Sequence, residues 1–273
     1  MPLAKAGEIN LYYEIQGRGE PLVLIMGYGF SSGHWFAIRD VLAKERQVIL
    51  FDNRGTGRSD KPDIQYTAKM MAADILGLLD KIGIGAASVF GVSMGGMIAQ
   101  EFTLSYPQRV SSLILGCTTC GGTKAVPVTA EAVAFLFDPG RAKLSEEEKA
   151  LSTVPWLWNK EFVDKNPGAI KRFIATSLEY PTPPHTLVSQ GNALVTFDSY
   201  DRLPDIKAPT LVICGNKDRL IPYENSQLLA SRIPGAELAI IENAGHGFIT
   251  DSTPKTGKLV LDFLRRHSKA GRP

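Results

Sequence analysis

The chain has little cysteine, little net charge and no long apolar run, and each of these shortages narrows the class of protein. Three of the 273 residues are cysteines, an odd number that agrees with a reducing compartment. No apolar run reaches the roughly 20 residues that a membrane-spanning helix requires, and no apolar segment follows a basic start as in a secretory signal. We therefore expect a cytoplasmic protein that does not enter a membrane.

The charges are nearly balanced, because 30 basic residues face 28 acidic ones and the formal net charge is +2. Such a value gives no reason to expect nucleic acid or an anionic membrane as a partner. A hydrophobic content of 44% is typical of globular proteins, and 273 residues suffice for one large α/β domain with an insertion. We expect a small molecule as the partner, and the sequence does not indicate an oligomeric state.

Two of the cysteines, Cys117 and Cys120, form a C-x-x-C string that raises the question of a redox or zinc site. A structural zinc site would need a second pair of ligands, and the remaining cysteine, Cys214, stands alone. Cys117 follows a short apolar run and Cys214 ends another, so we interpret both as buried thiols at strand ends. We expect no metal site.

A glycine-rich turn, Gly55-Thr56-Gly57, follows an apolar run in the way that a nucleotide-binding loop does. It lacks the third glycine of a dinucleotide fingerprint and the Gly-Lys-Ser/Thr ending of a P-loop. We therefore expect no cofactor.

Short apolar runs alternate with segments of helical spacing in the first and last parts of the chain. This alternation predicts an α/β fold, in which a mostly parallel sheet is covered by helices on both faces. The expected strands are residues 9–15, 22–26, 48–51, 88–90, 110–115, 210–213 and 237–241. The expected helices of these parts are residues 67–82, 94–106 and 256–267.

One long stretch, residues 123–204, contains no apolar strand run. Its helix-like pieces are residues 131–137, 145–151 and 169–178. We predict that residues 123–204 form a helical cap, inserted into a core domain that is built from residues 1–122 and 205–273.

The chain is organised around the stretch Gly91-Val92-Ser93-Met94-Gly95, which lies between an expected strand and an expected helix. A Gly-x-Ser-x-Gly frame in this context holds the serine hydroxyl at a sharp, strained turn at the end of the strand. The free N–H groups of the following helix N-terminus can then face an oxyanion formed there. We predict that Ser93 is a nucleophile, and the alternative is a tight packing turn.

A serine nucleophile needs a base, because its hydroxyl is barely ionised at neutral pH. Among the four histidines, His246 directly follows the last expected strand, where catalytic groups of parallel sheets gather. Asp218 follows the preceding strand and would orient the imidazole, and the chain order Ser93, Asp218, His246 is that of nucleophile-elbow enzymes. The weaker candidates for this acid are Asp198, Asp201 and Glu242.

In combination, these segments resemble the α/β-hydrolase superfamily over nearly the whole chain. The motifs that carry the resemblance are residues 91–96, 52–59, 209–218 and 245–246. The resemblance implies an eight-stranded sheet and a hydrolase mechanism. Within the superfamily, the Ser-Met-Gly-Gly-Met string and the place of the cap are similar to 3-oxoadipate enol-lactonases and small carboxylesterases.

One departure from the superfamily pattern lies in the turn after residues 22–26. Many members carry His-Gly-x-Gly there, whereas this chain has Met26-Gly27-Tyr28-Gly29. The oxyanion donors of the family are backbone N–H groups, so the resemblance still assigns this role to Tyr28 and Met94. A serine at position 93 argues against haloalkane dehalogenases and epoxide hydrolases, which use aspartate there.

The function expected from these residues is hydrolysis of a carboxylic ester through an acyl-enzyme, as in carboxylesterases and lactonases. By their positions, Met26, Trp156 and Trp158 are expected to line a pocket for a small or medium, partly apolar substrate. Packing inside the cap explains the two tryptophans equally well. Enol-lactone opening, carbon–carbon bond hydrolysis and perhydrolysis stay open as alternatives on the same triad, as does a non-catalytic ligand receptor.

Overall fold

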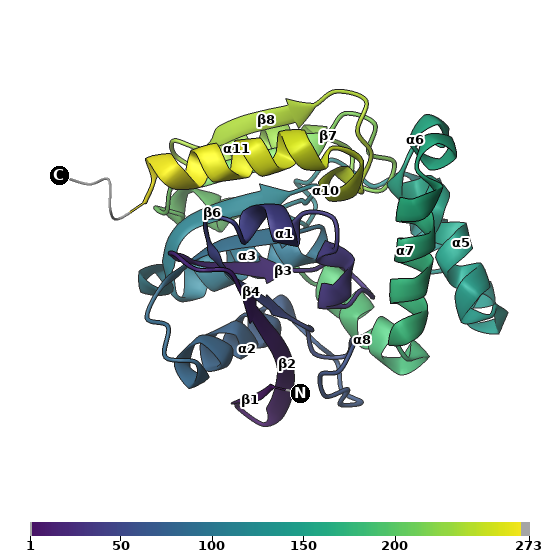
Figure 1. The fold of residues 1–273 in the computed structure, drawn as a ribbon, viewed down its shortest axis with the longest axis horizontal. Helices are drawn as coiled ribbons and strands as arrows, with labels where there is room; N and C mark the ends of the chain where they lie inside the picture. The colour runs from purple at the N-terminus through teal and green to yellow at the C-terminus, as the bar shows by residue number, and fades with distance from the viewer. Residues whose placement is uncertain (1, 269–273) are drawn as a thin grey trace.

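This computed structural model describes residues 2–268 of the chain. Eight strands in this part of the chain form one sheet (Figure 1). Its strand order is β1-β2-β4-β3-β5-β6-β7-β8. The strands are β1 (Leu3–Ala6), β2 (Ile9–Gln16), β3 (Pro21–Ile25), β4 (Gln47–Phe51), β5 (Ala87–Val92), β6 (Val110–Gly116), β7 (Thr210–Gly215) and β8 (Glu237–Ile241). The pairs β1–β2 and β2–β4 are antiparallel and the others are parallel, which confirms the predicted mostly parallel sheet.

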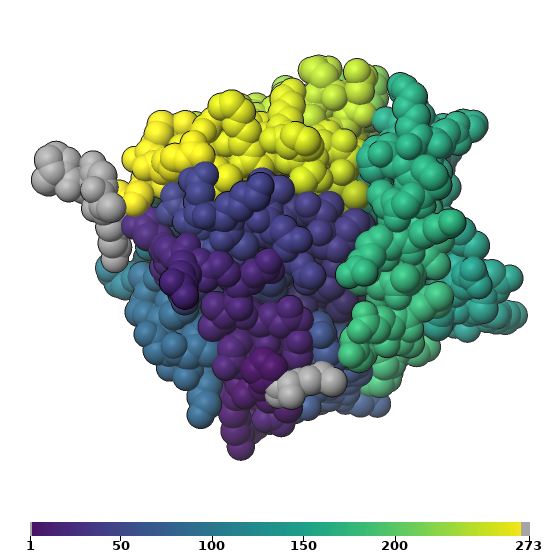
Figure 2. Space-filling view, viewed as in Figure 1, coloured from purple at the N-terminus to yellow at the C-terminus, as the bar shows by residue number. Residues whose placement is uncertain are grey.

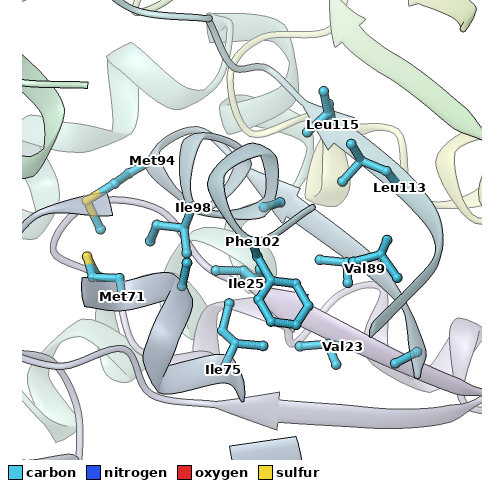
Figure 3. Close-up of a cluster of buried hydrophobic side chains, with 14 of the residues drawn as sticks. Val23, Ile25, Met71, Ile75, Val89, Met94, Ile98, Phe102, Leu113 and Leu115 are labelled. Carbon is cyan, nitrogen blue, oxygen red and sulfur yellow. The ribbon is translucent and has the colours of Figure 1, made fainter. Parts of the chain in front are cut away.

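Alternate side chains of the central strands point to opposite faces of the sheet, and helices cover both faces. On one face Val23, Val89 and Leu113 pack with side chains of α2 and α3, as Figure 3 shows. On the other face Leu24 and Phe90 belong to a cluster with α1, α10 and α11. These helices are α1 (Arg39–Leu42), α2 (Ala68–Lys81), α3 (Met94–Ser105), α10 (Phe248–Asp251) and α11 (Thr253–Arg266), while α9 (Glu224–Arg232) joins the first face. Burial on both faces explains why the central strands appear as continuous apolar runs in the sequence.

Between β6 and β7 the chain forms the inserted helices, which stand beside the carboxyl ends of the parallel strands (Figure 1). They are α4 (Ala130–Leu136), α5 (Glu146–Leu157), α6 (Lys160–Lys165), α7 (Pro167–Glu179) and α8 (Pro184–Val195). In Figure 2 their atoms, coloured teal to green, form a layer at the right of the molecule against the rest of the chain. The division into a core domain of residues 1–122 and 205–273 and a cap of residues 123–204 stays a prediction. None of the described helices is both long and apolar enough to cross a membrane.

Candidate active site

Ser93 lies between β5 and α3, at a turn that strains its backbone. Its φ of 55° and ψ of −124° fall in a region where residues with a side chain are rare. Gly91 and Gly95 permit the turn, because a Cβ at Gly91 would overlap the carbonyl of Gly95 and one at Gly95 that of Ile25. The two glycines of the Gly-x-Ser-x-Gly frame are therefore required by the close approach of strand and helix.

Asp218 and His246 lie in direct contact at the carboxyl ends of neighbouring strands. Asp218 follows β7, His246 follows β8, and Asp218 Oδ2 lies 2.7 Å from His246 Nδ1. The other carboxylate oxygen accepts the backbone N–H groups of Leu220 at 2.8 Å and Ile221 at 2.9 Å. This fully buried carboxylate favours the tautomer with a proton on Nδ1, which leaves the Nε2 lone pair of His246 free for a proton.

Two opposing effects act on the charge of the buried His246 ring. Burial lowers the pKa of the imidazole, the Asp218 carboxylate and the neighbouring Cys117 raise it, and the balance holds the pKa of His246 well above 6.5. His34 lines the same cavity as His246, but its surroundings differ. Burial lowers the pKa of His34 to about 4, and its Nδ1 and Nε2 lie 3.2 Å from Ser31 O and 3.1 Å from Ser177 Oγ. His34 is therefore neutral and engaged in contacts with the protein.

The weaker candidates for the acid lie elsewhere. Glu242 accepts a hydrogen bond from the side-chain amide of Asn216, and Asp198 accepts a backbone N–H two residues further along the chain. Both acids and Asp201 are exposed. Within residues 2–268, the carboxylate that is hydrogen-bonded to His246 is that of Asp218.

A cavity of about 660 Å³ lies between the strand ends and the inserted helices and is open to solvent on one side. Ser93, His246 and Met26 line it from the side of the sheet, and Phe173 and Leu187 line it from α7 and α8. Its wall is mainly apolar, and its charged side chains include Arg141, Glu146 and Lys149 of the inserted segment. A cavity of this volume and character is typical of a site for a small molecule.

The two tryptophans expected in the pocket lie in different places. Trp158 lines the cavity, and its indole Nε1–H donates to the Gly247 carbonyl at 3.1 Å. Trp156 does not border this cavity, because its ring stacks on Phe135 with 4.7 Å between centroids and lies under the Arg219 guanidinium. Residues two apart at the end of a helix point in different directions. The expectation that Trp156 lines the substrate pocket is therefore wrong for this cavity.

The two predicted oxyanion donors come from separate segments next to Ser93. Met94 is the first residue of α3, so its N–H belongs to the helix N-terminal groups that lack an intrahelical acceptor. The turn that carries Tyr28 passes close to Ser93, since a Cβ on Gly27 would lie 3.0 Å from the Ser93 Cβ. The Tyr28 hydroxyl donates to the carbonyl of Leu187 at 3.1 Å, so any role of Tyr28 at Ser93 falls to its backbone N–H.

Cys117 is a side chain of this site that the sequence reasoning missed. The prediction of a buried thiol at a strand end is correct, since Cys117 is buried directly after β6. The residue also lines the cavity, and its Sγ lies 4.0 Å from His246 Nε2. The sequence signal for Cys117 was its position, because it follows β6 as Ser93 follows the neighbouring β5. In the structure the two strand ends are joined, since the Ser93 N–H donates to the Gly116 carbonyl at 2.9 Å.

Comparison with known proteins agrees with this architecture. The family model described as the alpha/beta hydrolase fold matches residues 20–253. RutD of Azorhizobium caulinodans, whose name describes a carbamate hydrolase, is 32% identical over 96% of this chain and 98% of its own length. The 2-hydroxy-6-oxononadienedioate/2-hydroxy-6-oxononatrienedioate hydrolase of Burkholderia vietnamiensis is 32% identical over 95% of this chain and 92% of its own length. The solved structure of a thermophilic esterase from Thermogutta terrifontis is 28% identical, with a TM-score of 0.83 over 97% of each chain.

This chain belongs to the α/β-hydrolase family, as its motifs, its sheet and the family match together establish. The relatives are named for hydrolysis of different bonds, so the comparisons support a hydrolase without choosing the bond that it cleaves.

Proposed function

We propose that this protein is a serine hydrolase that cleaves a carboxylic ester, with Ser93 as nucleophile, His246 as base and Asp218 as the acid that orients the base. The observation that carries the proposal is the 2.7 Å contact between Asp218 and His246, beside the cavity that Ser93 also lines. A nucleophile at a strained turn and an imidazole held by a buried carboxylate are the parts that acyl transfer through serine requires.

In the proposed reaction, His246 Nε2 accepts the hydroxyl proton of Ser93 while Oγ attacks the ester carbonyl carbon. The buried Asp218 carboxylate stabilises the imidazolium that forms, and the imidazolium then gives its proton to the departing alcohol. Water attacks the acyl-enzyme in the second half, with His246 again as the base, and the carboxylic acid leaves.

The negative charge that develops on the carbonyl oxygen in both halves needs hydrogen-bond donors that are already in position. We assign this role to the backbone N–H groups of Met94 and Tyr28, which approach Ser93 from the helix N-terminus and from the turn after β3. Loss of one such donor in other enzymes costs about 10²- to 10³-fold in kcat. Backbone donors do not depend on the histidine that many relatives carry before this turn.

The substrate we propose is a small or medium ester with a partly apolar acyl or alcohol group. The cavity volume of about 660 Å³ and its mainly apolar wall favour such a molecule. Met26 and Trp158 border the cavity and are the proposed contacts. We further propose that residues 123–204 act as a cap, because Phe173 and Leu187 of the inserted helices complete the cavity wall.

Other hydrolytic reactions on the same triad remain alternatives. The relative from Burkholderia vietnamiensis is named for hydrolysis of oxo-dienoate substrates, and the relative from Azorhizobium caulinodans for hydrolysis of a carbamate. Enol-lactone opening is a further alternative. The alternative without catalysis is a receptor that binds a ligand and does not turn it over. The esterase from Thermogutta terrifontis, which matches over 97% of each chain, favours the ester.

The test is a comparison of kcat/KM for short-chain esters, enol-lactones, carbamates and ring-cleavage dienoates. We expect the esters to be the best substrates, with a burst of alcohol from an activated ester close to one equivalent of enzyme. A lactone, carbamate or dienoate turned over about a hundredfold better would replace the ester in the proposal. Binding of these compounds without turnover of any of them would indicate the receptor.

A further inference from the structure

A thiol and an imidazole face each other in the wall of the cavity. Cys117 Sγ lies 4.0 Å from His246 Nε2, and Cys117, Asp218 and His246 each place one possible ligand atom within 4.8 Å of the others. Cys117 is 2% exposed and His246 is 8% exposed, yet both border the cavity. The Cys117 backbone is strained, with a φ of 39°, as is that of Ser93 at the end of the adjacent strand. Strain of this kind concentrates at functional positions.

The two facing atoms are the ligand types that Zn²⁺ prefers, a cysteine sulfur and a neutral imidazole nitrogen. A tetrahedral Zn²⁺, with Zn–S of about 2.3 Å and Zn–N of about 2.0–2.1 Å, holds these ligand atoms about 3.6 Å apart. The separation of 4.0 Å between Cys117 Sγ and His246 Nε2 is a few tenths of an ångström longer. A small rotation of the thiol therefore brings both atoms to bonding distance.

The Asp218 carboxylate holds the imidazole of His246 at its other nitrogen, Nδ1. Asp218 accepts the Nδ1–H of His246 with one oxygen and two backbone N–H groups with the other, so its oxygens are engaged. A carboxylate behind the histidine fixes the ring and raises the basicity of the metal-binding nitrogen, which is a common arrangement at zinc sites. Asp218 would support the metal from behind, while water from the cavity fills the remaining positions.

We propose that Cys117 and His246 form an inhibitory site for a thiophilic divalent cation, with Zn²⁺ as the fitting ion. The inhibition rests on the proposed function, because the metal takes the Nε2 lone pair that His246 needs as a base. Binding forms a Zn–S and a Zn–N bond, and the thiol proton of Cys117 leaves to the buffer, together with the Nε2 proton of any His246 that is protonated. With two protein ligands the site is reversible, in contrast to a closed structural zinc site.

The C-x-x-C string itself does not form this site. Cys120 is fully buried, its Sγ contacts the neighbouring Gly121 carbonyl at 3.5 Å, and it does not border the cavity. Cys120 thus offers a matched control, since a substitution there removes a cysteine of the same string without touching His246.

The experiment measures metal binding and inhibition separately. Co²⁺ is added to the metal-free protein, and a sulfur-to-cobalt charge-transfer absorption band reports coordination by the thiolate. Zn²⁺ inhibition of ester hydrolysis is then titrated and reversed with EDTA. We expect the band and the inhibition in the wild type and in Cys120→Ala. In Cys117→Ala we expect no band and Zn²⁺ inhibition that is at least about tenfold weaker, because one of two ligands is gone. Cys117→Ser repeats the test with a side chain of similar size if the alanine variant does not fold.

The Ser93→Ala variant separates the two proposals. It keeps both metal ligands, so it should show the cobalt band even though its hydrolysis is lost. Absence of the band in the wild type, or an unchanged band in the Cys117 variants, would overturn the metal site. Retained hydrolysis in Ser93→Ala would instead contradict the proposed function and leave the band as independent evidence on the site.

Discussion

The single residue on which the proposed chemistry depends most visibly is Asp218. Its carboxylate accepts three hydrogen bonds, including that from His246. In Asp218→Asn, the amide oxygen can still accept the two backbone N–H groups, and the amide NH₂ then faces His246 Nδ1. We expect kcat to fall by roughly 10⁴-fold, as in serine proteases, because the amide favours the wrong tautomer and carries no charge to offset the imidazolium.

The measurement is kcat with an activated ester near pH 8, and the matched controls are Asp198→Asn and Glu242→Gln. Both control residues are exposed acids, so their variants should stay within about threefold of the wild type, as ordinary surface substitutions do. An Asp218→Asn enzyme within about tenfold of wild type would remove Asp218 from the proposed triad.

The pH dependence follows from the charge state of His246. The base must be neutral to accept a proton, and the Asp218 carboxylate holds the pKa of His246 well above 6.5. Protonation at lower pH therefore blocks the base. We expect kcat/KM of the metal-free enzyme to fall about tenfold per pH unit below an apparent pKa that lies above 6.5. The profile is measured from pH 5 to 9 with an ester of low intrinsic hydrolysis, and a midpoint below 6.5 would contradict the raised pKa of His246.

The sequence was most informative where a residue's role follows from its place at a strand end. Asp218 and His246 follow neighbouring parallel strands, so their proximity could be predicted from the topology, and the structure places them in contact. The direction of a side chain could not be predicted in this way. Trp156 and Trp158 have the same chemistry and nearly the same position, but one lies outside the cavity. Cys117 occupies a strand end as Ser93 does, yet its contact with His246 depends on a backbone turn that the sequence does not specify.

At the scale of elements, the end of α5 and the loop after β8 hold each other in place. Trp158 donates its indole N–H to the Gly247 carbonyl, and the Gly247 N–H donates to the Leu157 carbonyl at 2.9 Å. We expect Trp158→Phe to lower the free energy of unfolding by about 1–3 kcal/mol, because it removes the indole hydrogen bond and part of a buried ring. The Gly247 carbonyl keeps the backbone N–H groups of Thr250 and Asp251 as donors. Urea denaturation measures this change.

The control for that prediction is Trp156→Phe, the same substitution two residues earlier. Trp156 stacks on Phe135 and lies under Arg219 without an indole hydrogen bond to the loop, so phenylalanine keeps most of its contacts. Trp156→Phe should lower the free energy of unfolding by less than about 1 kcal/mol. Equal losses in the two variants would show that the hydrogen bond to Gly247 does not hold the histidine loop.

Helices and strands with strong periodicity or long apolar runs were predictable, and the others were not. The strand β1 is four residues long, lies at the sheet edge and alternates between exposed and buried, so no apolar run marks it. The apolar patterns predicted the other seven strands, and the eighth followed only from the eight-stranded sheet that the family resemblance implied. Helix α8 begins at Pro184, at the end of a proline-rich segment that looks like a loop. Proline fits the first turn of a helix, where its missing N–H costs no hydrogen bond, and this explains the omission.

For the molecule as a whole, the sequence predicted the sheet better than it predicted the cavity. Apolar strands between helices require a parallel sheet that is covered on both faces, and this is the arrangement in Figure 1. The cavity is formed where the inserted helices meet the strand ends, so its wall combines segments far apart in the chain. Such contacts depend on how the inserted helices are oriented, and the helical spacing of a sequence does not contain that orientation.

The central claim, that Ser93 is the nucleophile, is tested most directly by covalent labelling. A fluorophosphonate is added to the wild type and to Ser93→Ala, and the adduct is located by intact mass and peptide mapping. We predict one equivalent of adduct on Ser93 in the wild type and no adduct in a folded Ser93→Ala variant, whose ester hydrolysis falls by roughly 10³-fold or more. An adduct on another residue, or full hydrolysis by Ser93→Ala, would contradict the account.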